Sequence, residues 1–190
     1  MTDYRDKLKK ARLPEGTVSI CLRADLVADH ELLTQQLEEA KHAKGNSLAG
    51  SGVAQKREQL QQLEQEMRDS TQVFRLRGLA SRRVGSNAGD PRPTWQELKE
   101  QHPPREKDGD MLLADRIAGG VNVDAFAEPL VRWCLIDPVM NESDWAETLA
   151  VLSEGQFDAL VTKAWILNQR DVSIPFSSAA SQQNRNSGGE

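Results

Sequence analysis

The segment from Gly155 to Gln169 constrains the fold of this chain more than any other part of its sequence. A spacing of three and four residues places one set of side chains on a single helix face: Phe157, Leu160, Val161, Ala164, Trp165 and Asn168. Ile166 and Leu167 widen the apolar face toward the end of this helix. A helix that is apolar beyond one stripe needs a deep core or a second contact partner, and the periodicity is compatible with both.

The first part of the chain predicts a small β element with a helical hairpin inserted in it. Apolar and polar residues alternate over Val18–Leu22 and over Thr71–Leu79, which predicts two short strands, and we expect them to pair. Between them, residues 26–69 contain two amphipathic helices separated by a stretch rich in Gly, Ser and Asn, which predicts an αα-hairpin. Pro14-Glu-Gly16 predicts a turn ahead of the first strand.

The second part of the chain predicts a succession of helices. Capping residues and apolar spacing indicate that helices begin at Thr94, Asn122, Asn141 and Ser153. Pro129 would lie in the middle of the second of these helices, so we expect that helix to start later or to kink. Residues 105–120 are charged and contain glycines, and we expect a loop there with one helical turn.

These patterns predict a mostly α protein of the α+β class, in three segments. Residues 1–84 carry the strands and the hairpin, residues 85–172 form an acidic helical domain, and residues 173–190 form a disordered tail. Charge divides in the same way. Residues 1–84 hold 15 Lys+Arg and 12 Asp+Glu, a net charge of +3, whereas residues 85–190 hold 9 and 17, a net charge of −8.

No residue pattern in the sequence predicts catalysis. The three histidines have no Cys or carboxylate at ligand spacing, and the sequence contains no nucleophile elbow, P-loop or zinc-protease motif. We therefore expect no enzyme activity, no cofactor and no metal. Arg75, Arg77, Arg82 and Arg83 form a basic run, but Phe74 is the only aromatic residue beside them and lies on the opposite strand face, so nucleic-acid binding is not expected.

The sequence also predicts a cytoplasmic protein without a membrane partner. No run approaches the roughly 20 apolar residues of a membrane-spanning helix, and the charged N-terminus is unlike a signal peptide. Cys21 and Cys134 lie in apolar runs and are expected to be free thiols.

Several segments together resemble the tail assembly chaperones of long-tailed, siphovirus-type actinobacterial phages. In the first part they are Val18-Ser-Ile-Cys-Leu-Arg and Val73-Phe-Arg-Leu-Arg-Gly-Leu. In the second part the matching segments are 94–104, 122–126 and 130–134. The strongest likeness is at the end, in Gly155-Gln-Phe-Asp-Ala-Leu, Trp165-Ile-Leu-Asn-Gln-Arg-Asp-Val-Ser-Ile-Pro-Phe and Ser178-Ala-Ala-Ser.

The resemblance implies a non-catalytic protein of the host cytoplasm that binds the phage tape measure protein and keeps it soluble during tail assembly. A second copy of the chain, or a longer form made by frameshifting, is left open as a further partner. For contact with the tape measure we single out five apolar residues, although burial in the protein's own core would explain them equally: Trp145, Phe157, Leu160, Val161 and Trp165. The alternative function is a structural virion subunit, such as a minor tail or head–tail connector protein.

Overall fold

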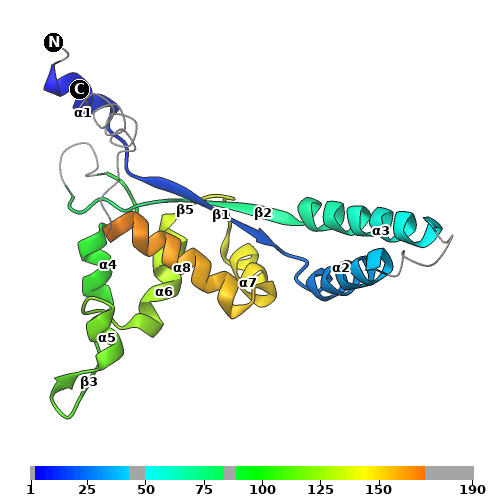
Figure 1. Ribbon diagram of the computed structural model, residues 1–190. Coiled ribbons are helices and arrows are strands. Elements are labelled where there is room, and N and C mark those ends of the chain that lie inside the picture. Colours follow the sequence, from blue (N-terminus) through cyan, green and yellow to red (C-terminus); the bar gives the residue numbers. More distant parts are fainter. Residues whose placement is uncertain (1–2, 43–49, 84–88, 170–190) are drawn as a thin grey trace, which may run out of the picture.

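The computed structural model describes residues 3–42, 50–83 and 89–169 (Figure 1). Its elements follow one another as α1 (Tyr4–Lys10), β1 (Glu15–Cys21), α2 (Leu26–His42), α3 (Gly50–Asp69), β2 (Thr71–Arg77), α4 (Trp95–Gln101), β3 (Glu106–Lys107), β4 (Asp110–Met111), α5 (Leu113–Ile117), α6 (Val123–Cys134), β5 (Leu135–Asp137), α7 (Glu142–Val151) and α8 (Glu154–Gln169). This confirms the predicted mostly α, α+β class. The predicted tail, residues 173–190, lies outside the described residues.

The main sheet has three antiparallel strands in the order β1-β2-β5. Val18 of β1 lies opposite Phe74 of β2, so the predicted pairing of the two strands that flank the hairpin is confirmed. The third strand, β5, is not predicted. Its three residues are too few for an alternating pattern, and its pairing with β2 depends on the tertiary structure.

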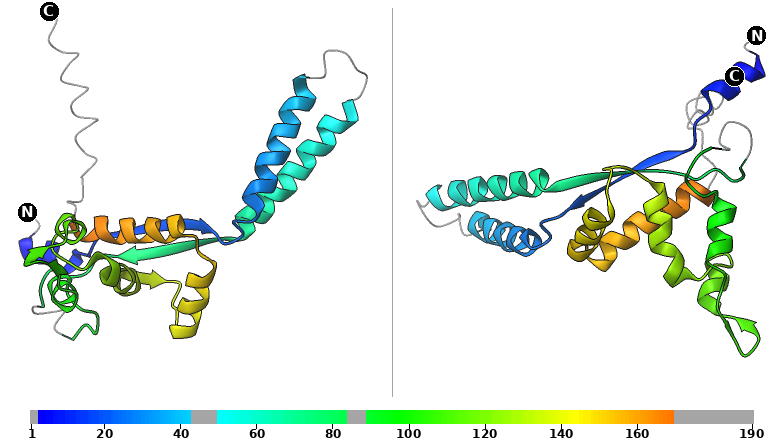
Figure 2. Two further views of the ribbon diagram at one scale, coloured as in Figure 1. Left: turned by 90° about the horizontal axis from the view of Figure 1, so that it is seen from below. Right: turned by 180° about the vertical axis from the view of Figure 1, so that it is seen from behind.

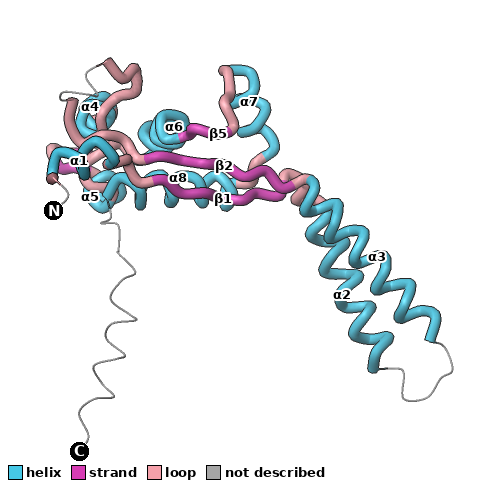
Figure 3. The backbone as a smooth tube through the Cα atoms, turned by 90° about the horizontal axis from the view of Figure 1, so that it is seen from above, coloured by secondary structure: helices cyan, strands magenta, loops and turns pink. Residues whose placement is uncertain are grey.

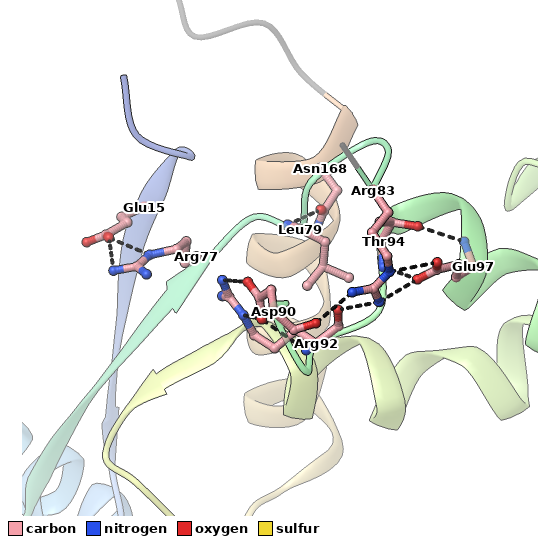
Figure 4. Close-up of polar contacts among 9 residues, drawn as sticks. All are labelled: Glu15, Arg77, Leu79, Arg83, Asp90, Arg92, Thr94, Glu97 and Asn168. Atoms are coloured by element: carbon pink, nitrogen blue, oxygen red, sulfur yellow. Dashed lines mark hydrogen bonds and ion pairs between the residues drawn. The ribbon is translucent and has the colours of Figure 1, made fainter. Parts of the chain in front are cut away.

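The predicted turn at Pro14–Gly16 is wrong, because β1 already begins at Glu15, opposite Arg77. The Glu15 carboxylate accepts hydrogen bonds from Arg75 at 2.6 Å and from Arg77 at 2.7 Å. These two bonds lower the pKa of Glu15, and Figure 4 shows the one with Arg77. Cross-strand ion pairs of this kind stabilise paired strands, so Glu15 belongs to β1 although Pro14 and Gly16 on either side of it favour a turn.

One hydrophobic core joins the sheet to the helices of the second half of the chain. α8 packs against β1, β2 and α6, and Figure 3 shows it running alongside the strands. The core combines side chains from both sides of residue 84, among them Ile20, Phe74, Leu76, Leu98, Phe126, Leu130 and Leu160. The predicted segment boundary at residue 84 therefore does not separate two cores.

The α2–α3 hairpin continues from the ends of β1 and β2 and projects away from this core (Figures 2 and 3). Its two helices pack along each other, and Leu26, Leu37 and Val53 are its buried apolar side chains. The hairpin predicted between the two strands is thus confirmed.

All four predicted helix starts are confirmed by their capping bonds. The Thr94 hydroxyl accepts from the Glu97 amide at 3.2 Å, and the Glu97 carboxylate accepts from the Thr94 amide at 2.9 Å. Equivalent side-chain caps begin the other helices at Asn122, Asn141 and Ser153. The later start inferred from Pro129 is wrong, since α6 runs from Val123 with Pro129 inside it. The buried residues Phe126 and Leu130 on either side of the proline pack this helix against the core. This packing offsets the backbone hydrogen bond that Pro129, which has no N–H, cannot donate.

The loop expected at residues 105–120 is also wrong, except for its helical turn at α5. β3 and β4 form a two-stranded ribbon, and the residues that join them, Asp108 and Gly109, both have positive φ angles, of 56° and 85°. This is the backbone of the Asp-Gly hairpin turn. The short helix α1, which begins at an Asp3 cap, is a further element that the sequence pattern does not predict.

Candidate functional site

An apolar groove lies between α5 and α8, with a volume of about 670 Å³. Ala114, Ile117, Ala118 and Val123 line it from the α5 side. The α8 side consists of Val161, Thr162, Trp165, Ile166 and Gln169. Every residue that lines this α5–α8 groove is uncharged, so its surface is suited to contact with an apolar partner and not to acid–base chemistry.

Trp165 is held in place by an aromatic cluster behind the groove. Its ring lies edge-on to Trp95, with centroids 5.5 Å apart, and edge-on to Phe126, with centroids 5.7 Å apart. Trp95 and Phe126 also meet edge-on, at 5.5 Å. Aromatic rings favour this T-shaped arrangement, so Trp165 presents a fixed apolar surface to the groove.

Ile117 supplies the most accessible apolar side chain of the groove. It is the last residue of α5, and 78% of its surface is exposed. Leu113, one turn earlier on the same helix, is exposed as well. An exposed isoleucine beside a fixed tryptophan gives this region the apolar character of a contact surface.

Asp115 fixes the position of α5 against α6. This carboxylate is fully buried and accepts four hydrogen bonds. Three come from Arg105, from its backbone amide, Nε and Nη2, at 2.7 to 3.0 Å, and one comes from the Val123 amide at 3.3 Å. Arg105 also pairs with Asp124. The bonds from Arg105 hold the pKa of Asp115 well below its usual range.

The C-terminal end of α8, which also lines the groove, is fixed by Asn168. Its Oδ1 accepts a hydrogen bond from the Leu79 amide at 2.7 Å (Figure 4), and its Nδ2 donates to Ala164 O at 2.7 Å and to Cys134 Sγ at 3.3 Å. Burial raises the pKa of the Cys134 thiol to about 11, so this cysteine is an unreactive part of the core. Asn168 thus ties α8 to the segment after β2.

The five predicted contact residues separate into two groups. Leu160 and Trp145 belong to the core: Leu160 has no exposed surface, and Trp145 Nε1 donates to Glu128 Oε1 at 2.7 Å. Phe157 is half-buried and packs against the same core. Val161 and Trp165 are the two that line the α5–α8 groove.

The residues of the groove that sequence reasoning missed come mainly from α5 and the start of α6. Ile117 and Val123 are the largest residues on that side of the groove. A helical turn near Ile117 and a helix from Asn122 are predicted, but nothing local shows that these two residues face Trp165. The Asp-Gly turn at residues 108–109 is the one signal that could have indicated an ordered structure here.

Within residues 3–42, 50–83 and 89–169 the side chains offer no group of three or more His, Cys, Asp or Glu that could hold a metal ion. In the same part of the chain no helix has both the length and the apolar character that crossing a bilayer requires. Cys21 and Cys134 are free thiols, as expected. No protein-family model, curated protein or solved structure matches this chain.

Proposed function

We propose that this chain is a tail assembly chaperone of a siphovirus-type phage, which binds the tape measure protein in the host cytoplasm without catalysing a reaction. The α5–α8 groove is the observation that carries the proposal. It is uncharged, open to solvent at Ile117, and lies along the segment whose sequence most resembles those chaperones.

The shape of the groove suits a helix from the partner. A helix in a groove is recognised through apolar residues at positions i, i+3, i+4 and i+7, and a groove between two helices receives such a row of side chains. Trp165 and Ile117 lie on its opposite sides and would contact the row from both directions. Tryptophans fixed by their neighbours commonly dominate the binding energy of an interface.

The charge of the chain fits the solubilising part of this function. Residues 85–190 have a net charge of −8, whereas the groove itself carries none. A bound apolar helix would therefore lie beside an acidic surface, and net charge opposes aggregation. A groove of this size gives a modest interface, which suits a partner that must later be released to the growing tail.

Co-expression with the tape measure protein of the same phage tests the proposal. We expect the wild-type chain to move the tape measure protein into the soluble fraction. Ile117→Glu should remove this effect, because a carboxylate buried against Trp165 without a partner weakens binding by roughly tenfold or more. Val139→Glu is the matched control, since Val139 is 90% exposed and lies outside the groove.

A tape measure protein that is equally soluble with and without the chain would contradict the proposal. Equal effects of Ile117→Glu and Val139→Glu would contradict the groove as the site. Mass spectrometry of purified particles separates a chaperone from a virion subunit, because a chaperone is absent from the finished particle and a subunit remains in it.

A further inference from the structure

The α2–α3 hairpin carries an exposed surface of leucines bordered by polar residues, which is distinct from the α5–α8 groove. Along one side of the hairpin, a shallow groove of about 490 Å³ is lined by Leu32, Leu33 and Leu63, together with Gln59 and Gln62, and has Asp29 and Glu66 at the end nearer the core. We call this surface the hairpin seam. Leu32 lies in it with 53% of its surface exposed.

The position of the hairpin leaves this surface uncovered by the described chain. α2 and α3 contact each other along their length but project away from the core (Figures 1 and 3). Isolated helices gain little stability without tertiary packing, and a pair with a narrow apolar stripe gains less than a bundle. A further pair of helices against the seam would supply the missing contacts.

The charges beside the seam are complementary to those of a second copy. Asp29 lies about one turn from Leu32 on the side of the core. On the side of the hairpin tip, Lys56 of α3 reaches across to α2: its Nζ donates to Gln36 Oε1 at 2.6 Å, and Gln36 lies about one turn after Leu32. A twofold axis at Leu32 that lies in the plane of the seam, perpendicular to the helices, stacks two seams in opposite directions. It would bring Asp29 of each copy opposite the Lys56 ammonium of the other.

We propose that two copies of this chain associate through their hairpin seams as an antiparallel four-helix bundle. Leu32, Leu33 and Leu63 of both copies form its apolar centre, and two symmetric pairs of Asp29 with Lys56 border it. Such an interface is isologous, the arrangement found in most homodimers. A second copy satisfies both charges and both apolar surfaces at once.

Light scattering and sedimentation of the full chain alone, without any tape measure protein, test this inference separately from the proposed function. We expect a dimer that dissociates on dilution. Leu32→Lys should give a monomer, while Val27→Lys, a change at an exposed apolar residue of α2 outside the seam, should leave the dimer intact. Circular dichroism of each variant confirms that the helices are retained.

Charge reversal gives the sharper result. Asp29→Lys and Lys56→Asp should each weaken the dimer by about tenfold or more, because like charges then face each other across the axis. The double variant should recover wild-type affinity. A monomer at every concentration up to the solubility limit would overturn the proposal. So would a dimer unaffected by Leu32→Lys, double-variant affinity no better than that of the single variants, or a seam that binds only a tape measure helix.

Discussion

Asp115 shows how one buried side chain can determine the shape of a contact surface. Asp115→Asn keeps its size but removes the charge that Arg105 and the Val123 amide bind. We expect this variant to loosen α5 against α6, with faster hydrogen exchange at the amides of Arg105 and Val123. Asp124→Asn changes an exposed partner of the same arginine and should have a much smaller effect. Equal protection in Asp115→Asn and wild type would show that the buried pair does not hold α5.

Leu160 is a residue of the core, whereas Ile117 lines the groove that we propose as the contact surface. Leu160 has no exposed surface, so Leu160→Ala should lower the free energy of unfolding by about 2–5 kcal/mol through lost packing and a cavity. Ile117→Ala should change it by less than about 0.5 kcal/mol, because 78% of that side chain is already exposed. Urea denaturation measures both values. A large loss for Ile117→Ala would mean that this residue serves the fold.

At the scale of the element, the start of α4 makes stability depend on pH. Hydrogen bonds from Arg83, at 2.9 Å, and from the Thr94 amide lower the pKa of Glu97 to about 2, from a usual value of 4.5 (Figure 4). Because the folded pKa is lowered, this stabilisation is fully present above the usual value and is lost as the pH falls toward 2.

We therefore expect the free energy of unfolding to decrease below about pH 4.5, and to decrease less in Glu97→Gln than in the wild type. Denaturation curves collected from about pH 6 downward measure the difference between the two proteins. Parallel pH profiles would show that Glu97 contributes nothing to this dependence.

The elements that the sequence predicted are those with strong local signals. Thr94 with Glu97 and Ser153 with Gln156 carry their capping chemistry within four residues, so these helix starts can be inferred locally. The strands that flank the hairpin alternate apolar and polar residues, over Val18–Leu22 and over Thr71–Leu79. β5 and α5 are shorter and are held by contacts outside the element itself, β5 by pairing with β2 and α5 by the bonds of Asp115 with Arg105 and Val123. No local pattern predicts such contacts.

In the whole molecule, the predicted contact residues of α8 face different neighbours, and the sequence of one helix does not show which neighbour each residue faces. The periodicity of the last helix places Leu160, Val161 and Trp165 on one broad face, but it does not show which part faces the sheet. In the structure Leu160 is buried in the core, whereas Val161 and Trp165 line the groove beside α5. Because α5 was expected to be part of a loop, half of the groove could not be predicted.

Photocrosslinking from position 117 tests whether the α5–α8 groove binds an apolar helix of the tape measure protein, as we propose. A photoreactive phenylalanine analogue at Ile117 should crosslink to an apolar helical segment of the co-expressed tape measure protein. The same group at Val139, which is also exposed but lies outside the groove, should give no such product. Crosslinks from position 139 and none from position 117 would contradict the claim.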